Sequence, residues 1–293
     1  MSLQVIANPH AGHGRGAHVL GRVEAELRKR GVAHSIALSR WAGHAVQIAT
    51  QAARVGATGL VLVGGDGTMF EALNGMQKAG RMLPVAQVPI GTGNSFIKDL
   101  GIESTDDGLA ALHGGRTRKV DIGVARSSAG ECRFANIVGA GFVADVAARA
   151  GSFKRLGDAS YTIGVLIEVA RLRSLPCRIR ADGRLIEREA IFVEVCNSRK
   201  TGGNMIMAPR AVLDDGVFDV VIATAMNRRT LLGLFPLIFT GEHVNDPHVE
   251  TFTCSRLDVE FDPPQRVTPD GELLGSTPLS VEVLPRALEV FTL

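Results

Sequence analysis

The chain has 293 residues, 32 of them basic and 30 acidic, which gives a net charge of +2. Aliphatic residues and its 34 glycines are abundant and only 5% of residues are aromatic, a composition that suits an α/β protein with many tight turns. The balanced charge and the absence of a long Lys/Arg run argue against a nucleic-acid partner. A chain of this length is expected to form two domains.

Nothing in the sequence resembles a secretion signal or a membrane span. The longest apolar run, 231–240, is half of the roughly 20 residues that cross a bilayer. The cysteines are far apart and without a Cys-x-x-Cys pair, so all four are predicted to be buried and reduced: Cys132, Cys177, Cys196 and Cys254. We therefore expect a cytoplasmic protein, with peripheral membrane contact and a homodimer left open.

The first 125 residues alternate between strands and helices. Apolar strands are predicted at 3–7, 33–38, 59–63 and 85–89. Helical periodicity follows each of them, over about 19–30 and 44–54, after Thr68 and from about Asn94. Such alternation with short connections predicts a doubly wound parallel sheet.

The second half has a different pattern. Strands are predicted at 132–138 and 217–223, and an Asp182-Gly183 turn joins strands 178–181 and 185–196 into a hairpin. Helices are predicted at 142–150, 158–173 and 227–239, and strands separated by turns fill 249–293. This half is expected to be largely antiparallel.

The most specific motif is Gly64-Gly65-Asp66-Gly67-Thr68, which follows an apolar strand and opens a helix. Glycines let a backbone approach a phosphate closely, and a helix N-terminus offers free N–H groups and partial positive charge. The motif predicts a phosphate-binding loop, with Asp66 as a candidate for Mg²⁺ or for orienting phosphates.

Two further glycine turns follow strands of the same predicted sheet, Gly91-Thr92-Gly93-Asn94 after 85–89 and Asn8-Pro9-His10-Ala11-Gly12 after 3–7. In a parallel sheet all three turns lie at the carboxyl edge, where ligands bind. Together they predict one nucleotide held between them.

In this order the motifs resemble the catalytic region of diacylglycerol kinases, sphingosine kinases and related bacterial lipid kinases. The resemblance covers nearly the whole chain. Besides the three loops, its parts are Ser39, Gly43-His44-Ala45, Glu71, Asn74, Leu156-Gly157, Tyr161, Gly202-Gly203, Ala208-Pro209, Asp214-Asp215-Gly216 and Asp270-Gly271-Glu272.

The resemblance implies an N-terminal α/β nucleotide-binding domain, similar to those of NAD kinase and phosphofructokinase, and a C-terminal antiparallel β-sandwich. We expect the first domain at 1–124, with 285–293 returning to it, and the second at 125–284.

The resemblance also implies the site residues. ATP is expected at Asn8, Pro9, His10, Ala11, Gly12, Ser39, Gly64, Gly65, Asp66, Gly67, Thr68, Met69, Phe70, Gly91, Thr92, Gly93 and Asn94. A structural Mg²⁺, or Ca²⁺, is expected on the Asp215 carboxylate and the carbonyls of Val212 and Val217, since hard cations prefer oxygen ligands.

The resemblance assigns Glu272 as the acceptor of the hydroxyl proton, with Asp270 close by as the alternative and Asp66 as the third catalytic residue. One departure from the family pattern is Ser95, where many bacterial members have Asp after Gly-Thr-Gly-Asn. It does not imply loss of activity, but it leaves diacylglycerol in doubt as the substrate.

The function expected from the resemblance is an ATP- and Mg²⁺-dependent kinase acting on a lipid alcohol at a membrane surface. The apolar helices at 160–172 and 229–239 either wall an acyl pocket or simply pack in the core. Two alternatives remain: a kinase for a soluble acceptor, as in NAD kinase, and a nucleotide-binding regulatory protein without turnover.

Overall fold

The computed structural model describes residues 2–9, 11–91, 93–151 and 167–293, and the chain forms two compact units. Unit 1 comprises Met1–Asp121 and Arg286–Leu293, and unit 2 comprises Ile122–Pro285. Two long strands, β5 (Arg116–Ser127) and β16 (Leu279–Thr292), contribute residues to both units. Among the described residues, no helix combines the length and apolar character needed to cross a bilayer.

Unit 1 is built on a parallel sheet, with β1 (Leu3–Ala7) between β2 (His34–Leu38) and β3 (Gly59–Gly64). On the far side of β3 lies β4 (Val85–Pro89), and the end of β16 pairs with β4 through Val290. All residues of β3 and β4 are buried, as expected for parallel strands covered on both faces.

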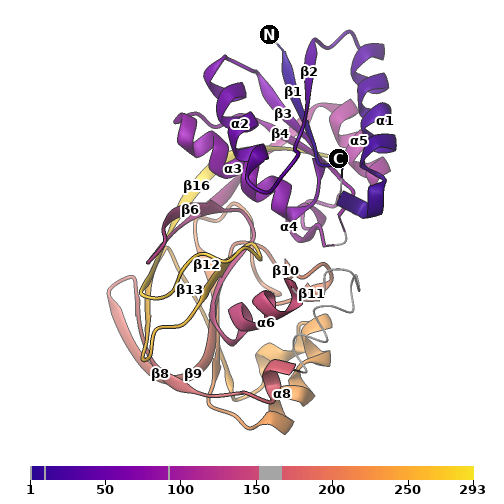
Figure 1. Cartoon of the computed structure of the whole chain (residues 1–293). Helices are drawn as coiled ribbons and strands as arrows, with labels where there is room; N and C mark the ends of the chain where they lie inside the picture. Colours follow the sequence, from indigo (N-terminus) through magenta and orange to yellow (C-terminus); the bar gives the residue numbers. More distant parts are fainter. Residues whose placement is uncertain (1, 10, 92, 152–166) are drawn as a thin grey trace. The chain divides into compact units, whose positions relative to one another are not determined.

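Helices cover both faces of this sheet (Figure 1). The helices α1 (Gly16–Lys29) and α5 (Thr105–Gly114) pack on one face, whose core includes Val5, Val61 and Val88. The helices α2 (His44–Arg54) and α3 (Asp66–Ala79) pack together, because Gly75 brings α3 close to the Val46 carbonyl. The short helix α4 spans Ser95–Lys98.

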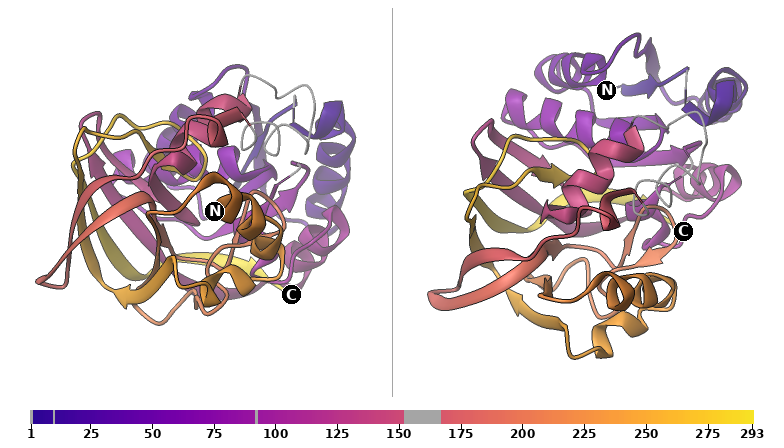
Figure 2. Two further views of the ribbon diagram at one scale, coloured as in Figure 1. Left: turned by 90° about the horizontal axis from the view of Figure 1, so that it is seen from below. Right: turned by 60° about the horizontal axis from the view of Figure 1, so that its bottom comes forward.

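Unit 2 is largely antiparallel, as predicted. The strand β9 (Arg184–Cys196) joins two groups of strands, since its first half pairs with β8 (Leu175–Ala181) and its second half lies between β7 (Ile137–Gly141) and β12 (Phe218–Thr224). The β8–β9 hairpin stands out in Figure 2, and its turn has positive φ at both Asp182 and Gly183.

The remaining elements of unit 2 complete the antiparallel pairing. The strand β14 (Arg256–Phe261) pairs with both β8 and β16, and β13 (Val249–Cys254) pairs with β12. The other described elements of unit 2 are β6 (Gly130–Phe134), α6 (Phe142–Gly151), β10 (Lys200–Thr201), β11 (Met205–Ile206), α8 (Arg228–Leu234), β15 (Val267–Pro269) and the 3₁₀ helices Pro236–Phe239 and Glu242–Asn245. Unit 1 contains a further 3₁₀ helix at Ala11–Gly14.

The expected fold class is confirmed, and so are the four buried free cysteines. Two predicted elements differ. The single strand expected at 132–138 is broken between Phe134 and Ile137, because the backbone amides there bond a side chain described below. The helix expected at 227–239 ends at Leu234 and continues as a 3₁₀ turn from Pro236, which has no N–H to donate. The helix predicted at 158–173 falls mostly outside the described residues.

The buried carboxylate of Glu194 sits in the middle of the unit 2 sheet. Its register partner on β7 is Gly139, where a Cβ would lie 2.6 Å from Val143 Cγ2 and 3.3 Å from Glu194 Oε1, so the glycine makes room for both side chains. Burial raises the pKa of Glu194 to about 8. The native protein therefore holds a proton at neutral pH that the unfolded chain has released.

This proton makes stability depend on pH. The stabilising effect is complete below the unfolded pKa, near 4.5, and is lost as the pH rises through about 8. We expect Glu194→Gln to remove this dependence, so that at pH 9 the variant exceeds the wild type in free energy of unfolding, by at least about 1 kcal/mol. Urea unfolding between pH 5 and 9 measures this, with the exposed Glu187→Gln as control. Parallel curves for all three proteins would contradict it.

Candidate active site

Three of the predicted loops, together with Ser39, do converge at the carboxyl edge of the unit 1 sheet. The first residue after β2, after β1 and after β4 donates its N–H to a carbonyl in the last two residues of the neighbouring strand. Ser39 bonds Ala7 at 2.8 Å and Asn8 bonds Val63 at 3.0 Å, while Ile90 bonds Gly64 at 3.3 Å. These bonds fix the height of every loop above the sheet.

Glycines let the loops pack backbone to backbone. Gly12 has φ of +61°, and a Cβ on it would lie only 2.3 Å from the Ile90 carbonyl oxygen. A Cβ on Gly91 would lie 3.0 Å from the Gly65 Cα, and one on Gly64 would lie 2.3 Å from the Thr68 Oγ1. Side chains at these positions would push the loops apart, so the close approach requires glycine.

Helix α3 begins at Asp66, directly after the Gly64-Gly65 pair. The first N–H groups of a helix have no partner inside it, and they carry partial positive charge. Three glycine turns around a helix N-terminus therefore form a cradle suited to phosphate groups.

The Asp66 carboxylate does not point to open solvent but to the start of α4. Its Oδ2 accepts from the Ser95 N–H at 3.1 Å, and among the described residues nothing bonds its buried Oδ1. Burial raises the pKa of Asp66, and the backbone N–H groups of Ser95, Phe96 and Asn94 oppose that rise. A carboxylate kept buried with one free oxygen is a candidate for function rather than stability.

Asn94 has a similar environment. It adopts φ of 54°, its Nδ2 donates to the Gly91 carbonyl at 2.7 Å, and its Oδ1 is buried without a partner among the described groups. Free oxygens on Asp66 and Asn94 fit a hard cation or its water ligands. Such an arrangement is compatible with the Mg²⁺ that accompanies ATP in the kinase expected from the sequence.

Glu71 has a role that the motif alone did not reveal. Its carboxylate accepts from the Gly43 and Ala45 N–H groups at 2.8 and 2.9 Å, so a residue of α3 caps α2. Gly43 makes this possible with φ of +85°. Glu71 therefore holds the loop after Ser39 beside the cradle, and the Gly-His-Ala motif at 43–45 was the sequence signal for it.

The other residues predicted for ATP lie on the same loops or on the first turns of α3. Of these, Met69 is buried in the core at 2% exposure, and Thr68 is buried against Gly64. His10 and Thr92 fall outside the described residues. Pro9, Ala11, Gly67, Phe70 and Gly93 lie in the described loops and the first turn of α3.

In unit 2 the two carboxylates of the Asp-Gly-Glu motif have different surroundings. Asp270 accepts three backbone N–H groups, from Ala135 at 2.9 Å, Asn136 at 2.9 Å and Ile137 at 3.0 Å, which explains the break between β6 and β7. Glu272 is exposed, and its own N–H bonds the Pro269 carbonyl at 2.8 Å. Asp270 therefore builds the turn, while the Glu272 side chain is exposed.

The predicted metal loop forms a tight turn. Asp215 is exposed, and its Oδ1 accepts from the Val217 N–H at 3.2 Å; Val212 is 45% exposed. Within the described ranges no cluster of three or more His, Cys, Asp or Glu residues has metal-binding geometry. The predicted site has only one such side chain, the Asp215 carboxylate, and two backbone carbonyls, so this finding does not bear on it.

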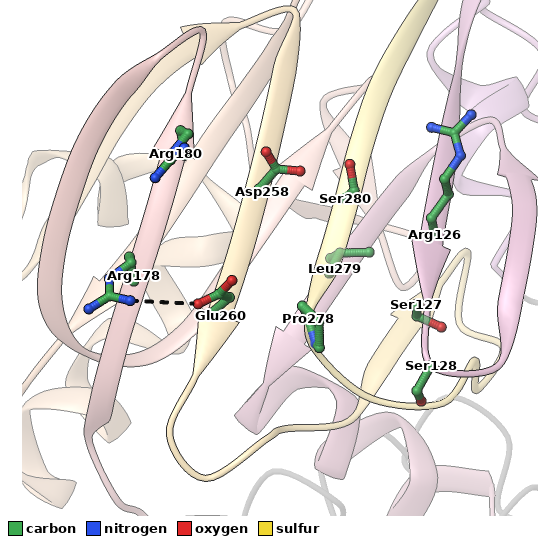
Figure 3. A pocket seen from close by; sticks show the side chains of 10 residues that line it. All are labelled: Arg126, Ser127, Ser128, Arg178, Arg180, Asp258, Glu260, Pro278, Leu279 and Ser280. Atoms are coloured by element: carbon green, nitrogen blue, oxygen red, sulfur yellow. Dashed lines mark ion pairs between the residues drawn. The ribbon is translucent and has the colours of Figure 1, made fainter.

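A hollow of about 480 Å³ lies elsewhere, on the outer face of the unit 2 sheet. Figure 3 shows Arg126, Arg178, Arg180, Asp258 and Glu260 around it. Arg178 pairs with Glu187 at 3.1 Å and with Glu260 at 3.9 Å, as expected for a solvated sheet face. We therefore take the glycine cradle, and not this mixed-charge hollow, as the candidate active site.

Comparison with known proteins agrees with this geometry. Residues 2–125 match the diacylglycerol kinase catalytic domain, and residues 136–292 match the YegS C-terminal NAD kinase beta sandwich-like domain. The chain is 31% identical to a diacylglycerol kinase of Mycobacterium tuberculosis over 97% of its length and 93% of that protein, and 28% identical to one of Bacillus subtilis over 94% and 91%.

A solved structure shows that the fold is shared. A crystal structure of a diacylglycerol kinase from Bacillus anthracis strain Sterne superposes with a TM-score of 0.77 at 20% identity, over 100% of this chain and 97% of that one. The ordered loops, the match to both domains and the relatives at up to 31% identity lead to one conclusion. The chain belongs to the diacylglycerol kinase family of lipid kinases, which phosphorylate an alcohol group.

Proposed function

We propose that this chain transfers the γ-phosphate of ATP to a hydroxyl group of a membrane lipid. The observation that carries the proposal is the cradle, in which three glycine loops meet at the N-terminus of α3 around the half-satisfied carboxylate of Asp66. Unit 1 is then the nucleotide-binding domain.

In this proposal, different residues bind the triphosphate and accept the proton of the attacking hydroxyl. The cradle N–H groups hold and orient the triphosphate, and Asp66 and Asn94 provide oxygens for Mg²⁺, which would neutralise phosphate charge when bound. Glu272 accepts the proton of the attacking hydroxyl. Asp270 positions Glu272 by fixing the turn against the amides of residues 135–137.

Diacylglycerol is the acceptor that the relatives' names suggest. Ser95 is the departure that bears on this choice, because it is 1% exposed and its N–H already bonds Asp66. An Asp at 95 would place a second buried carboxylate beside Asp66, whereas Ser leaves a single charge. We therefore propose a lipid alcohol, and leave diacylglycerol and other lipid alcohols as alternatives to be separated by experiment.

The decisive assay supplies γ-labelled ATP and Mg²⁺ with mixed micelles of diacylglycerol, of a sphingoid base or of a fractionated lipid extract, and with NAD in parallel. Labelled lipid that extracts into the organic phase is the expected product. Labelled NAD without labelled lipid would favour the soluble-acceptor alternative. Nucleotide binding without any transfer would favour the regulatory one.

We further propose that Asp215, with the carbonyls of Val212 and Val217, binds a structural Mg²⁺ or Ca²⁺. Binding to the native state alone raises the melting temperature as the ion is titrated. We expect such a rise in nucleotide-free protein and its loss in Asp215→Ala, with Asp258→Ala, a half-buried aspartate of the same unit, as control. A melting temperature that does not change with either ion would refute the site.

A further inference from the structure

Exposed apolar residues gather at one edge of unit 1. Ile36, Leu38 and Trp41 are 38%, 44% and 56% exposed, within six residues of one another. Arg40 is also exposed and His44 follows closely, and we call these five residues the Trp41 edge. Aromatic residues make up only 5% of this chain, so an indole at the surface calls for an explanation.

The Trp41 edge includes the last strand of the sheet. On one side β2 pairs with β1, and among the described residues no strand pairs with its other side. An open edge strand with apolar side chains is a place where another surface docks, unless charge protects it.

No acidic residue lies between Glu26 and Asp66 in the sequence, and the segment contains five basic residues: Arg28, Lys29, Arg30, Arg40 and Arg54. Four of them lie at the C-terminal ends of α1 and α2, away from the carboxyl edge of the sheet, and Arg28 is paired with Glu24 at 2.5 Å. Arg40 is the exposed basic residue next to Trp41, and the nearby Glu71 carboxylate accepts N–H groups of the loop and α2. Arg40 therefore gives this edge a positive charge that suits a negatively charged surface.

The Trp41 side chain is held in place rather than loose. Its ring stacks on His44 with centroids 4.0 Å apart and planes at 13°. The His44 Nδ1 accepts from the Arg40 N–H at 3.1 Å, and Gly43 turns the chain into α2. This tight turn leaves two neighbouring residues, Arg40 and Trp41, exposed.

An apolar and aromatic surface beside an exposed arginine matches the interface of an anionic bilayer. Indole rings settle at the headgroup level, and basic side chains gain from anionic lipids. The loop also begins at Ser39, whose N–H bonds Ala7 at the same sheet edge as the glycine cradle. A membrane that touches Trp41 therefore lies near the edge of the sheet where phosphate is transferred.

We propose that the Trp41 edge is a membrane-docking surface for anionic lipid bilayers. This inference rests on the proposed lipid acceptor, and it adds where the enzyme meets the lipid. Its central test does not depend on turnover, because Trp41 is the only tryptophan of the chain and its fluorescence reports this site alone.

The experiment adds vesicles of phosphatidylglycerol or of phosphatidylcholine to the full chain and records emission excited at 295 nm. We expect a blue shift with the anionic vesicles, quenching when their acyl chains are brominated, and reversal by high salt. Vesicle sedimentation gives the affinity. Each basic side chain near an anionic surface contributes a factor of about five, so Arg40→Glu should weaken binding roughly 30-fold.

Matched variants separate this edge from general attraction. Arg116→Glu changes the charge of unit 1 equally and Leu185→Ser removes an equally exposed leucine of unit 2, so both should bind nearly as the wild type does. Leu38→Ser should weaken binding. Equal effects of Arg40→Glu and Arg116→Glu, or sedimentation with vesicles without any change in Trp41 emission, would overturn the proposal.

Two other results are informative. A blue shift that grows with protein concentration and needs no lipid would assign the edge to a second copy of the chain and overturn membrane docking. Kinase activity on micelles together with an unresponsive Trp41 on vesicles would overturn docking and leave the proposed function intact. Docking without lipid phosphorylation would support the surface and count against the proposed acceptor.

Discussion

A Glu272→Gln variant is expected to lose about 10²–10⁴-fold in turnover while its affinity for ATP stays nearly unchanged. The reason is the contrast within one turn. The Asp270 carboxylate is occupied by three backbone N–H groups, whereas the Glu272 side chain is exposed and the Glu272 main-chain N–H bonds the Pro269 carbonyl. Gln keeps the shape of the side chain and cannot accept the proton of the hydroxyl.

Turnover with ATP and lipid both saturating measures this effect. Glu260→Gln, another exposed glutamate of unit 2, serves as the control and should remain active. Comparable turnover for Glu272→Gln and the wild type would exclude Glu272 as the proton acceptor.

Asp270→Asn should be damaging for a different reason. An amide has one acceptor oxygen in place of two, so at least one of the three N–H groups loses its partner, at a cost of about 1–3 kcal/mol. We therefore expect a lower urea midpoint together with lower activity. If Asp270→Asn instead lost turnover at full stability, and Glu272→Gln did not, the two roles would be exchanged.

An Asp66→Asn variant is expected to lose about 10²–10³-fold or more in phosphoryl transfer and to be at least as stable as the wild type. Burial raises the pKa of Asp66, so the native state disfavours the charged form of this side chain. The contribution of Asp66 to the free energy of unfolding therefore falls as the pH rises through that pKa. Asn has the same size, can still accept the Ser95 N–H, and carries no charge to bury.

Melting temperature and single-turnover transfer from labelled ATP test the two halves of this prediction separately. Asp106→Asn changes the same group on the exposed face of α5 and serves as the control. A folded Asp66→Asn protein with full activity would remove the Gly-Gly-Asp loop from the mechanism. A protein that fails to fold would assign Asp66 to structure instead.

Local chemistry in the sequence was enough to locate the strands β1 to β4 of the parallel sheet and the glycine loops that follow them. The run at 61–68 combines an apolar strand, three glycines and a helix start, and the rules for parallel sheets put it on the same edge as Gly12 and Gly91. The Asp182-Gly183 hairpin is equally local, since its turn requires positive φ at two residues.

The tertiary structure decided the roles of the individual carboxylates, because these depend on partners that are distant in the chain. Asp270 meets the amides of residues 135–137, Asp66 meets the start of α4, and Glu71 caps α2. No periodicity or spacing predicts which acidic side chain accepts hydrogen bonds from backbone N–H groups and which is left exposed. Only the folded chain separates Glu272 from Asp270, and only the folded chain leaves Trp41 on the surface at the open edge of the sheet.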